Sequence, residues 1–402
     1  MSFVKKSIKS IWKPDTVFSI MASYKKYVEE NGKAGATNAI IGSLCDEEGK
    51  LVTYKSVFES ERSFPDTVRA AYPAGLKGNP EYIEAMKNWV LDGNSNLYSD
   101  GIATVGGTGA VFVALDLCLE ANEAVLLPEI AWGSYQLMAN EFNFDVVNYD
   151  VYDIDDMLNK AESIANKQGK LVLVINSPCQ NPCGQSLNTD EWKKIVNKLN
   201  EIAKKAEVVL VNDIAYIDYA REPKEARKYI QTFDELNENV LVLICASTSK
   251  SFSYYGQRLG ELIILNKNEK TVEEVEKAAE LKVRCTWSTC SNIAMSNVAQ
   301  VINSYQNEYV DEKKAYIDIL YKRAEAFVNE AKEVGLDIYD FKEGFFVTLK
   351  FTDENKRDEA HQKLLDNHIY TVKTVKGIRV AICSMPVKEI EGLAKRIKAV
   401  IA

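Results

Sequence analysis

Short apolar runs alternate with longer stretches of helical pattern through most of the chain. The runs predict strands at 124–127, 171–176, 208–212, 240–245 and 261–265. Stretches between the runs predict helices, among them 80–91, 191–206 and 271–282. Strands that are buried on both faces lose polar alternation, and intervening helices favour parallel pairing. The pattern therefore predicts an α/β fold with a mostly parallel central sheet flanked by helices.

The pattern changes after about residue 295. A long helical stretch at 296–332 is followed by a strand-like run at 344–350 and by a final helix at 388–400. These elements predict a smaller α+β domain, to which the N-terminal segment also contributes. We expect residues 16–45 and 300–402 to form the small domain and residues 46–299 to form the large one.

Composition narrows the possible functions. The chain has 402 residues, enough for two lobes that share a large core, and 46% of them are hydrophobic. A net charge of −9 argues against a nucleic-acid surface, and no apolar stretch reaches the roughly 18 residues of a membrane span. No signal-peptide core is present, so we expect a cytoplasmic protein with eight free cysteines. With only two histidines, histidine catalysis and a metal site are not expected.

The first candidate for chemistry is Lys250. It follows the hydroxyl residues Ser247 and Ser249 soon after the strand predicted at 240–245, and Arg258 comes eight positions later. An amine at the end of a strand can form a Schiff base with an aldehyde cofactor, and hydroxyls with a guanidinium can hold a phosphate. The alternative is a solvated lysine in a serine-rich loop.

A second segment supports the cofactor interpretation. The strand predicted at 208–212 runs into Asp213, and Tyr216 follows three positions later. An aspartate placed against a pyridine nitrogen keeps that nitrogen protonated and makes the ring an electron sink. A nearby tyrosine hydroxyl can hydrogen-bond the phenolic oxygen of the ring. An aspartate that merely caps the next helix remains an open alternative for this segment alone.

Two turns complete the pattern. Asn181 lies in a Pro/Gly turn after the strand predicted at 171–176 and could donate to the same phenolic oxygen, although an ordinary Asn-Pro turn has the same sequence. Gly107 and Thr108 begin a helix-like stretch, where backbone N–H groups and the helix dipole favour a phosphate. The glycine run lacks the third glycine of a dinucleotide fingerprint, which argues against a nicotinamide-dependent oxidoreductase.

In order, spacing and residue type, these segments resemble class I aminotransferases of the fold-type I pyridoxal-phosphate enzymes, near the subgroup that acts on aspartate and aromatic amino acids. The resemblance runs over most of the chain and includes the segments 38–50 and 377–382. It implies pyridoxal 5′-phosphate as cofactor and a homodimer with shared active sites. It also implies that residues 1–15 form an arm that reaches across the dimer.

The resemblance assigns a role to each candidate. Lys250 would hold the cofactor as a Schiff base and then act as the general base at the substrate's Cα. Asp213 would hold the ring nitrogen, and Tyr216 and Asn181 the phenolic oxygen. Trp132 would stack on the ring, although a tryptophan there could also belong to the core. The phosphate would be bound by Gly107, Thr108, Ser247, Ser249 and Arg258, with Tyr72 donated by the neighbouring subunit.

Three residues are implied to bind the substrate. Arg379 resembles the arginine that holds the α-carboxylate, because a planar guanidinium matches a carboxylate bidentately, and Gly42 would let the backbone approach that carboxylate. Arg284 aligns with an arginine that binds the distal carboxylate of a dicarboxylic substrate from the partner subunit, while a structural role is nearly as favoured. The chain departs from the family pattern at 289–291 and at Tyr135, where a histidine often stands. These departures leave the distal pocket, and hence the choice between acidic and aromatic substrates, open.

The sequence therefore predicts an aminotransferase that moves the amino group of an L-amino acid to a 2-oxo acid such as 2-oxoglutarate in a ping-pong cycle. One alternative is a lyase that performs β-elimination or decarboxylation on the same scaffold, because the pocket selects the bond that breaks. A second alternative is a sensor that binds the cofactor without turnover. The sensor is disfavoured because the enzyme-like region begins almost at once and the chain is acidic.

Overall fold

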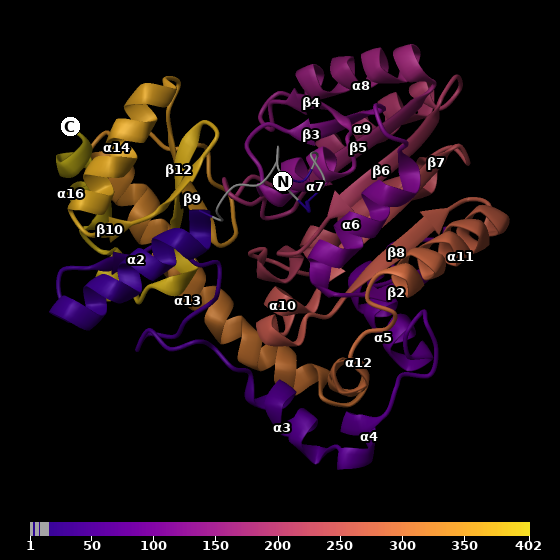
Figure 1. Cartoon of the computed structure of the whole chain (residues 1–402), viewed down its shortest axis with the longest axis horizontal. Helices are drawn as coiled ribbons and strands as arrows, with labels where there is room; N and C mark the ends of the chain where they lie inside the picture. Colours follow the sequence, from indigo (N-terminus) through magenta and orange to yellow (C-terminus); the bar gives the residue numbers. More distant parts are fainter. Residues whose placement is uncertain (1–2, 5–7, 9–15) are drawn as a thin grey trace.

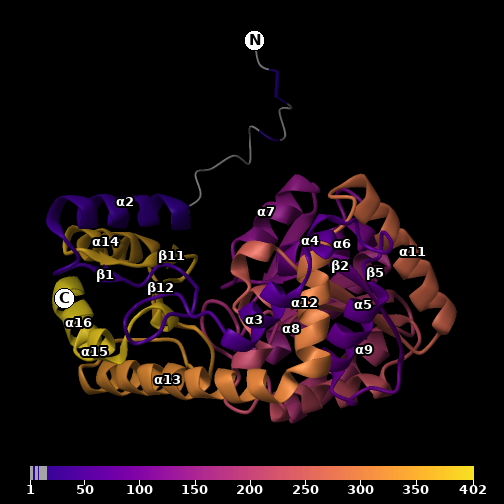
Figure 2. The same ribbon diagram turned by 90° about the horizontal axis from the view of Figure 1, so that it is seen from below.

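The computed structural model describes residues 3–4, 8 and 16–402, so the predicted arm at 1–15 lies largely outside the described residues. The described chain forms a larger and a smaller lobe, and one long helix runs along both of them (Figures 1 and 2). Among the described helices, none combines the length and the apolar character needed to cross a membrane.

A seven-stranded sheet forms the centre of the larger lobe, in the order β2-β8-β7-β6-β5-β3-β4. The strands are β2 (Tyr98–Thr104), β3 (Ala124–Pro128), β4 (Asp145–Tyr149), β5 (Lys170–Asn176), β6 (Glu207–Asp213), β7 (Val240–Ser247) and β8 (Gly260–Asn266). Strands β3 to β7 pair in parallel, whereas β8 runs antiparallel to both of its neighbours. The predicted mostly parallel sheet is confirmed, with the run at 261–265 as its antiparallel member.

Helices cover both faces of this sheet. Leu171, Leu173 and Ile175 of β5 join one buried cluster, and Val172 and Val174 join another on the opposite face. The first cluster includes α5 (Pro80–Leu91), α8 (Ile154–Gln168), α9 (Thr189–Ile202) and α12 (Asn292–Ser304), and the second includes α6 (Gly106–Cys118), α7 (Ser134–Glu141) and α11 (Glu269–Cys285). Because both faces are buried, the strands appear in the sequence as continuous apolar runs.

The larger lobe also contains shorter elements. They are α3 (Lys55–Ser63), α4 (Asp66–Ala70), α10 (Thr248–Ser251) and the 3₁₀ turns η1 (Ile217–Tyr219), η2 (Glu225–Glu235) and η3 (Tyr255–Gln257). The helix α10 has only four residues and begins directly after β7, with the Ser247 hydroxyl accepting from the Ser249 N–H at 3.3 Å. This arrangement places Lys250 at the carboxyl end of β7.

The smaller lobe contains a three-stranded antiparallel sheet, β11-β12-β9, and the parallel pair β1-β10. The strands are β1 (Thr37–Asn38), β9 (Phe346–Lys350), β10 (Ile369–Tyr370), β11 (Val372–Thr374) and β12 (Gly377–Ala381). Helices α2 (Thr16–Asn31), α14 (Glu354–Asp366), α15 (Val387–Ile390) and α16 (Leu393–Ile401) and the turn η4 (Ile382–Ser384) complete it. The long helix α13 (Gln306–Glu333) extends from this lobe along the larger one (Figure 2). The predicted domain boundaries stay a prediction.

Several elements differ from the sequence prediction, among them strand β4, which was not predicted. Strand β2 was not predicted, because its first three residues are polar and only its last four are buried. The single helix predicted at 296–332 is two helices, α12 and α13, separated at Tyr305, which has φ −126° and ψ 22°. The final helix predicted at 388–400 is interrupted at Gly392, which has φ 80° and separates the short α15 from α16. A left-handed glycine of this kind ends one helical segment without strain.

Candidate active site

One pocket lies where β5, β6 and β7 end. Parallel strands present their carboxyl ends at the same edge of a sheet, and ligands bind there in such folds. The pocket is lined by Gly107, Thr108, Trp132, Asn176, Asn181, Asp213, Ala215, Tyr216, Ser247, Ser249, Lys250 and Arg258. The structure therefore brings together all the predicted cofactor-binding residues except Tyr72. Their individual roles stay predictions.

Lys250 points into this pocket from α10. Its Nζ lies 5.5 Å from the ring centre of Tyr216 and 5.8 Å from that of Tyr255. Burial, together with the neighbouring Arg258, lowers the pKa of Lys250 to about 8, while Asp213 acts in the opposite direction. A large fraction of the amine is therefore neutral near pH 8, the form that acts as a nucleophile or a base.

Asp213 is fixed at the other side of the pocket by two hydrogen bonds. Its Oδ1 accepts from the Ala215 N–H at 3.0 Å, and its Oδ2 accepts from the Tyr135 hydroxyl at 2.5 Å. Burial raises the pKa of Asp213, and both hydrogen bonds oppose that rise. Tyr135 therefore contacts Asp213 directly, and its bearing on the distal substrate pocket stays a prediction. Tyr135 is buried on α7 behind Asp213, and burial holds its own pKa well above the usual value, so it remains a donor.

The start of α6 and Arg258 form a cradle for an anion. Gly106 has φ +73°, and a Cβ there would lie 2.6 Å from Nη2 of Arg258. Nη1 of Arg258 donates to the Ser249 hydroxyl at 3.0 Å and to the Tyr255 carbonyl at 3.0 Å. Free N–H groups at a helix start, hydroxyls and a guanidinium are the donors that a phosphate needs. The sequence prediction named Gly107 but missed Gly106, whose left-handed conformation allows the close approach.

Asn176 is a pocket residue that the sequence analysis did not single out. Its Oδ1 accepts from the Asn181 N–H at 2.8 Å, and its Nδ2 donates to the Asp213 carbonyl at 2.9 Å. It therefore fixes the Asn181 turn relative to the end of β6. Its position as the last residue of a predicted strand was the available signal.

Arg379 approaches the pocket from β12 in the smaller lobe. It is buried, with Nη1 donating to Oδ1 of Asn181 at 3.2 Å and Nη2 to the Ile40 carbonyl at 2.7 Å. Its Nε has no hydrogen-bond partner among the described residues, and no carboxylate is paired with the guanidinium there. Burial lowers its pKa. Gly42 lies beside it, where a Cβ would meet the Phe346 ring at 2.5 Å.

Tyr72 and Arg284, unlike Arg379 and Gly42, are exposed to solvent, and none of these four predicted site residues is part of the pocket lining. Tyr72 is 90% exposed in the loop before α5. Arg284 is exposed in the last turn of α11 and donates to the Ser288 hydroxyl at 2.7 Å. Both were predicted to act on a neighbouring subunit, so their roles stay predictions.

The fold and this pocket define an α/β enzyme scaffold in which a lysine and an aspartate face one cavity at the ends of parallel strands. The chain belongs to the aminotransferase class I and II family, whose model matches residues 40–397. The fold class and the aminotransferase activity predicted from the sequence are confirmed, and neither the lyase nor the sensor is favoured.

Relatives and solved structures agree with this assignment. An aromatic-amino-acid aminotransferase from Paracoccus denitrificans is 29% identical over 287 residues, which are 68% of this chain and 69% of that one. An aspartate aminotransferase from Pseudomonas aeruginosa is 23% identical over 92% of this chain and 94% of its own. The crystal structure of an aminotransferase from Anaerococcus prevotii matches with a TM-score of 0.95 and 27% identity over 99% of both chains. An aromatic-amino-acid aminotransferase from Burkholderia pseudomallei, covalently bound to pyridoxal phosphate, matches in fold with a TM-score of 0.78, 23% identity and full coverage of both chains.

Proposed function

We propose that the pocket holds pyridoxal 5′-phosphate and that the enzyme moves an amino group from an L-amino acid to a 2-oxo acid such as 2-oxoglutarate in two half-reactions. The observation that carries this proposal is the arrangement of Lys250 and Asp213 on one cavity beside an anion cradle. When bound, the cofactor supplies an aldehyde carbon and a ring that accepts electrons from the substrate.

The residues present fit this cofactor. The backbone of Gly107 and Thr108, the hydroxyls of Ser247 and Ser249, and the Arg258 guanidinium would hold its phosphate. Asp213, whose Oδ2 accepts from the Tyr135 hydroxyl, would hold a proton on the ring nitrogen. Tyr216 and Asn181 would bind the phenolic oxygen, and Trp132 would cover the ring. Every predicted contact except the one from Tyr72 comes from a single chain.

Lys250 would carry out the proton transfer. Its Nζ would hold the cofactor and, once freed by the incoming amino acid, would be the group placed to accept and hold the proton of the substrate's Cα. A pKa of about 8 suits both tasks, because the amine can hold or release a proton close to neutral pH.

Arg379 would hold the α-carboxylate of the substrate. A buried guanidinium without an anionic partner is unfavourable, and a bidentate carboxylate supplies both charge and acceptors. Nε of Arg379 has no hydrogen-bond partner among the described residues and would donate to this carboxylate. Fixing the carboxylate from the smaller lobe would orient the Cα–H bond toward Lys250.

The substrate class and the assembly belong to the same proposal. We infer a homodimer in which Tyr72 and Arg284 each serve the neighbouring pocket, and their exposure in the single chain supports this. Arg284 would then bind the distal carboxylate of aspartate or glutamate, and relatives named for aspartate and for aromatic amino acids support both classes. A cytoplasmic location is supported by the free thiols of all eight cysteines, which lie within residues 45–383.

Absorption spectroscopy of the purified protein tests the proposal. A near-visible band that L-aspartate bleaches and 2-oxoglutarate restores would establish both half-reactions and the acidic substrate. A band that responds only to aromatic amino acids would keep the cofactor and reject the distal role of Arg284. Lys250→Ala should abolish the band, and Lys267→Ala, which removes an exposed lysine, should not. No band after addition of pyridoxal phosphate to the wild type would refute the proposal.

A further inference from the structure

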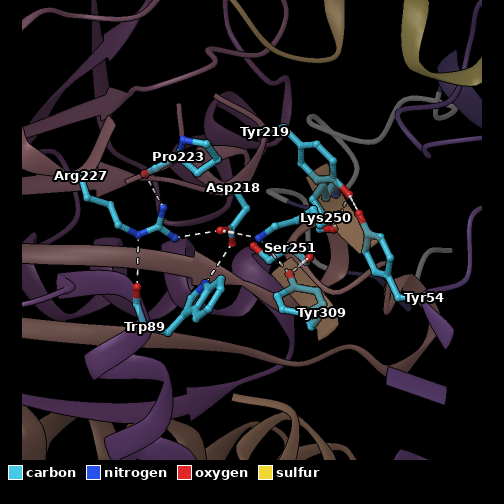
Figure 3. A network of polar contacts seen from close by, with 10 residues as sticks. Tyr54, Trp89, Asp218, Tyr219, Pro223, Arg227, Lys250, Ser251 and Tyr309 are labelled. Atoms are coloured by element: carbon cyan, nitrogen blue, oxygen red, sulfur yellow. Dashed lines mark hydrogen bonds and ion pairs between the residues drawn. The ribbon is translucent and has the colours of Figure 1, made fainter. Parts of the chain in front are cut away.

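A buried ion triad lies beside the main chain of Lys250, outside the pocket itself (Figure 3). Oδ1 of Asp218 accepts from Nη2 of Arg227 at 2.8 Å and from Nζ of Lys313 at 2.9 Å. Nε1 of Trp89 donates to its Oδ2 at 3.1 Å. All three charged side chains are at most 4% exposed. Such a cluster is unfavourable to bury unless its hydrogen bonds are complete.

The charges keep Asp218 ionised. Burial alone would raise the pKa of this carboxyl, but Lys313 and Arg227 outweigh burial and hold the pKa well below its usual range. The Asp218 carboxylate thus pairs with both Arg227 and Lys313, and the Lys313 ammonium has further N–H groups that can donate to another acceptor. Nζ of Lys313 uses one of them on the Tyr309 hydroxyl at 3.1 Å.

Two tyrosines connect this cluster to the turn that carries Lys250. The Tyr309 hydroxyl, which accepts from Lys313, donates to the Ser251 carbonyl. Tyr219, the residue after Asp218, donates to the Lys250 carbonyl at 3.2 Å and shares a 2.6 Å hydrogen bond with the Tyr54 hydroxyl. Figure 3 shows both hydroxyls directed at consecutive carbonyls of the turn.

The turn is held by its own backbone and by these two hydroxyls together. The helix α10 has only four residues, and the Lys250 carbonyl accepts from the Ser253 N–H at 3.0 Å. The residue Ser253, two positions after it, has φ 50°, a conformation that few residues other than glycine adopt freely. The Tyr309 hydroxyl therefore supplies a donor to the Ser251 carbonyl, and the Tyr219 hydroxyl adds a second donor to the Lys250 carbonyl.

We propose that Tyr309 and Tyr219 are positioning residues for Lys250, and that the triad of Asp218, Arg227 and Lys313 exists to fix them. The inference rests on the proposed function for the use of the amine, but the geometry involves protein groups alone. Without these two hydroxyl donors, the turn would admit water around Nζ of Lys250, and the amine would lose its fixed orientation.

Conservative variants separate positioning from general stability. Tyr309→Phe removes the hydroxyl and keeps the ring that stacks on Phe252 at 4.8 Å. Lys313→Met removes the donor that orients this hydroxyl and leaves Asp218 paired with Arg227. Tyr149→Phe is the matched control, because its buried hydroxyl also donates to a main-chain carbonyl, Val174, at 2.8 Å. Thermal unfolding of each full-length variant reports its stability.

The main measurement is the pH dependence of trace acetylation at Lys250 by acetic anhydride, located by peptide mass spectrometry after any carbonyl cofactor has been removed with hydroxylamine. The charged groups that act on the amine are Arg258, Asp213 and Arg379, with the Cys383 thiol, and every variant keeps them. A shifted midpoint therefore reports the surroundings of the amine and not a deleted neighbouring charge.

We expect a midpoint near 8 in the wild type and in Tyr149→Phe, and a midpoint moved toward 10.5 in Tyr309→Phe and Lys313→Met. The same two variants should capture added pyridoxal phosphate about fivefold more slowly at pH 7.5, the effect of one lost hydrogen bond. Midpoints equal to that of Tyr149→Phe would overturn the inference. Shifted midpoints in a protein that gives no band with the cofactor would refute the proposed function and leave the positioning role standing.

Discussion

Replacing Tyr135 by phenylalanine tests how Asp213 is kept ionised. The change removes one hydroxyl, 2.5 Å from Oδ2 of Asp213, from a fully buried site and preserves the ring. A hydrogen bond to a charged group contributes about 1.5–3 kcal/mol. At about 1.4 kcal/mol for each pKa unit, its loss raises the pKa of Asp213 by roughly one to two units. Burial already raises that pKa in the wild type, so the shift moves it toward neutral pH.

The assay is the dissociation constant of pyridoxal phosphate, measured by equilibrium titration from pH 5.5 to 8.5. Asp213 must be a carboxylate to hold the ring nitrogen, so affinity falls as pH drops through its pKa. We expect the loss of affinity at acid pH, the acid limb of the titration, to occur roughly one to two pH units higher in Tyr135→Phe than in the wild type. Below that pH the variant should bind the cofactor about 10- to 100-fold more weakly.

Tyr149→Phe serves as the control here as well, since its lost hydrogen bond involves a neutral carbonyl. If the acid limbs of wild type, Tyr135→Phe and the control coincide, the hydroxyl does not keep Asp213 ionised, and the reasoning from the 2.5 Å contact fails.

Three further changes have defined outcomes. Gly106→Ala should weaken cofactor binding about tenfold in the same titration, because Gly106 has φ +73° and an added Cβ would meet the Arg258 guanidinium. Gly93→Ala is the control, since Gly93 has φ +71° but open space around it, and it should leave cofactor binding unchanged. Arg379→Lys should raise the KM for the amino donor by roughly tenfold or more with a smaller effect on kcat in steady-state assays, since an ammonium cannot bind the carboxylate bidentately; equal kcat and KM losses would contradict a binding role. Glu261 is fully buried, both of its carboxyl oxygens lack a hydrogen-bond partner among the described residues, and burial raises its pKa well above 4.5. The folded state therefore holds a proton that the unfolded state releases, and the free energy of unfolding falls as the pH rises above 4.5. Glu261→Gln should therefore lose less stability between pH 5 and 8 in denaturant titrations, by about 1.4 kcal/mol per pH unit, and parallel curves would refute this.

The sequence predicted the pocket better than the contacts behind it. Lys250, Asp213 and Asn181 each follow a buried strand, and strand ends meet at one edge of a parallel sheet, so their neighbourhood could be predicted from the apolar runs alone. Strand β2 was missed because its polar first half follows no apolar period. The division between α12 and α13 at Tyr305 was missed because neither glycine nor proline marks it.

Contacts between distant segments explain the remaining differences. Asp218 and Lys313 are 95 positions apart, and Tyr135 and Asp213 are 78 apart. A buried lysine in a helix and a tyrosine after a turn have the same local pattern as surface residues. Only the tertiary packing of α13 and α7 brings Lys313 and Tyr135 to their polar partners, Asp218 and Asp213.

The single helix α13 also limits which length changes the chain can tolerate. Its 28 residues span about 42 Å. Near one end Tyr309 reaches the Ser251 carbonyl, and further along Arg323 donates to the carbonyls of Cys45 and Cys383, close to Arg379. Each inserted residue would rotate one end relative to the other by about 100° and lengthen the helix by about 1.5 Å. Insertions and deletions between Tyr309 and Arg323 should thus be excluded from functional variants.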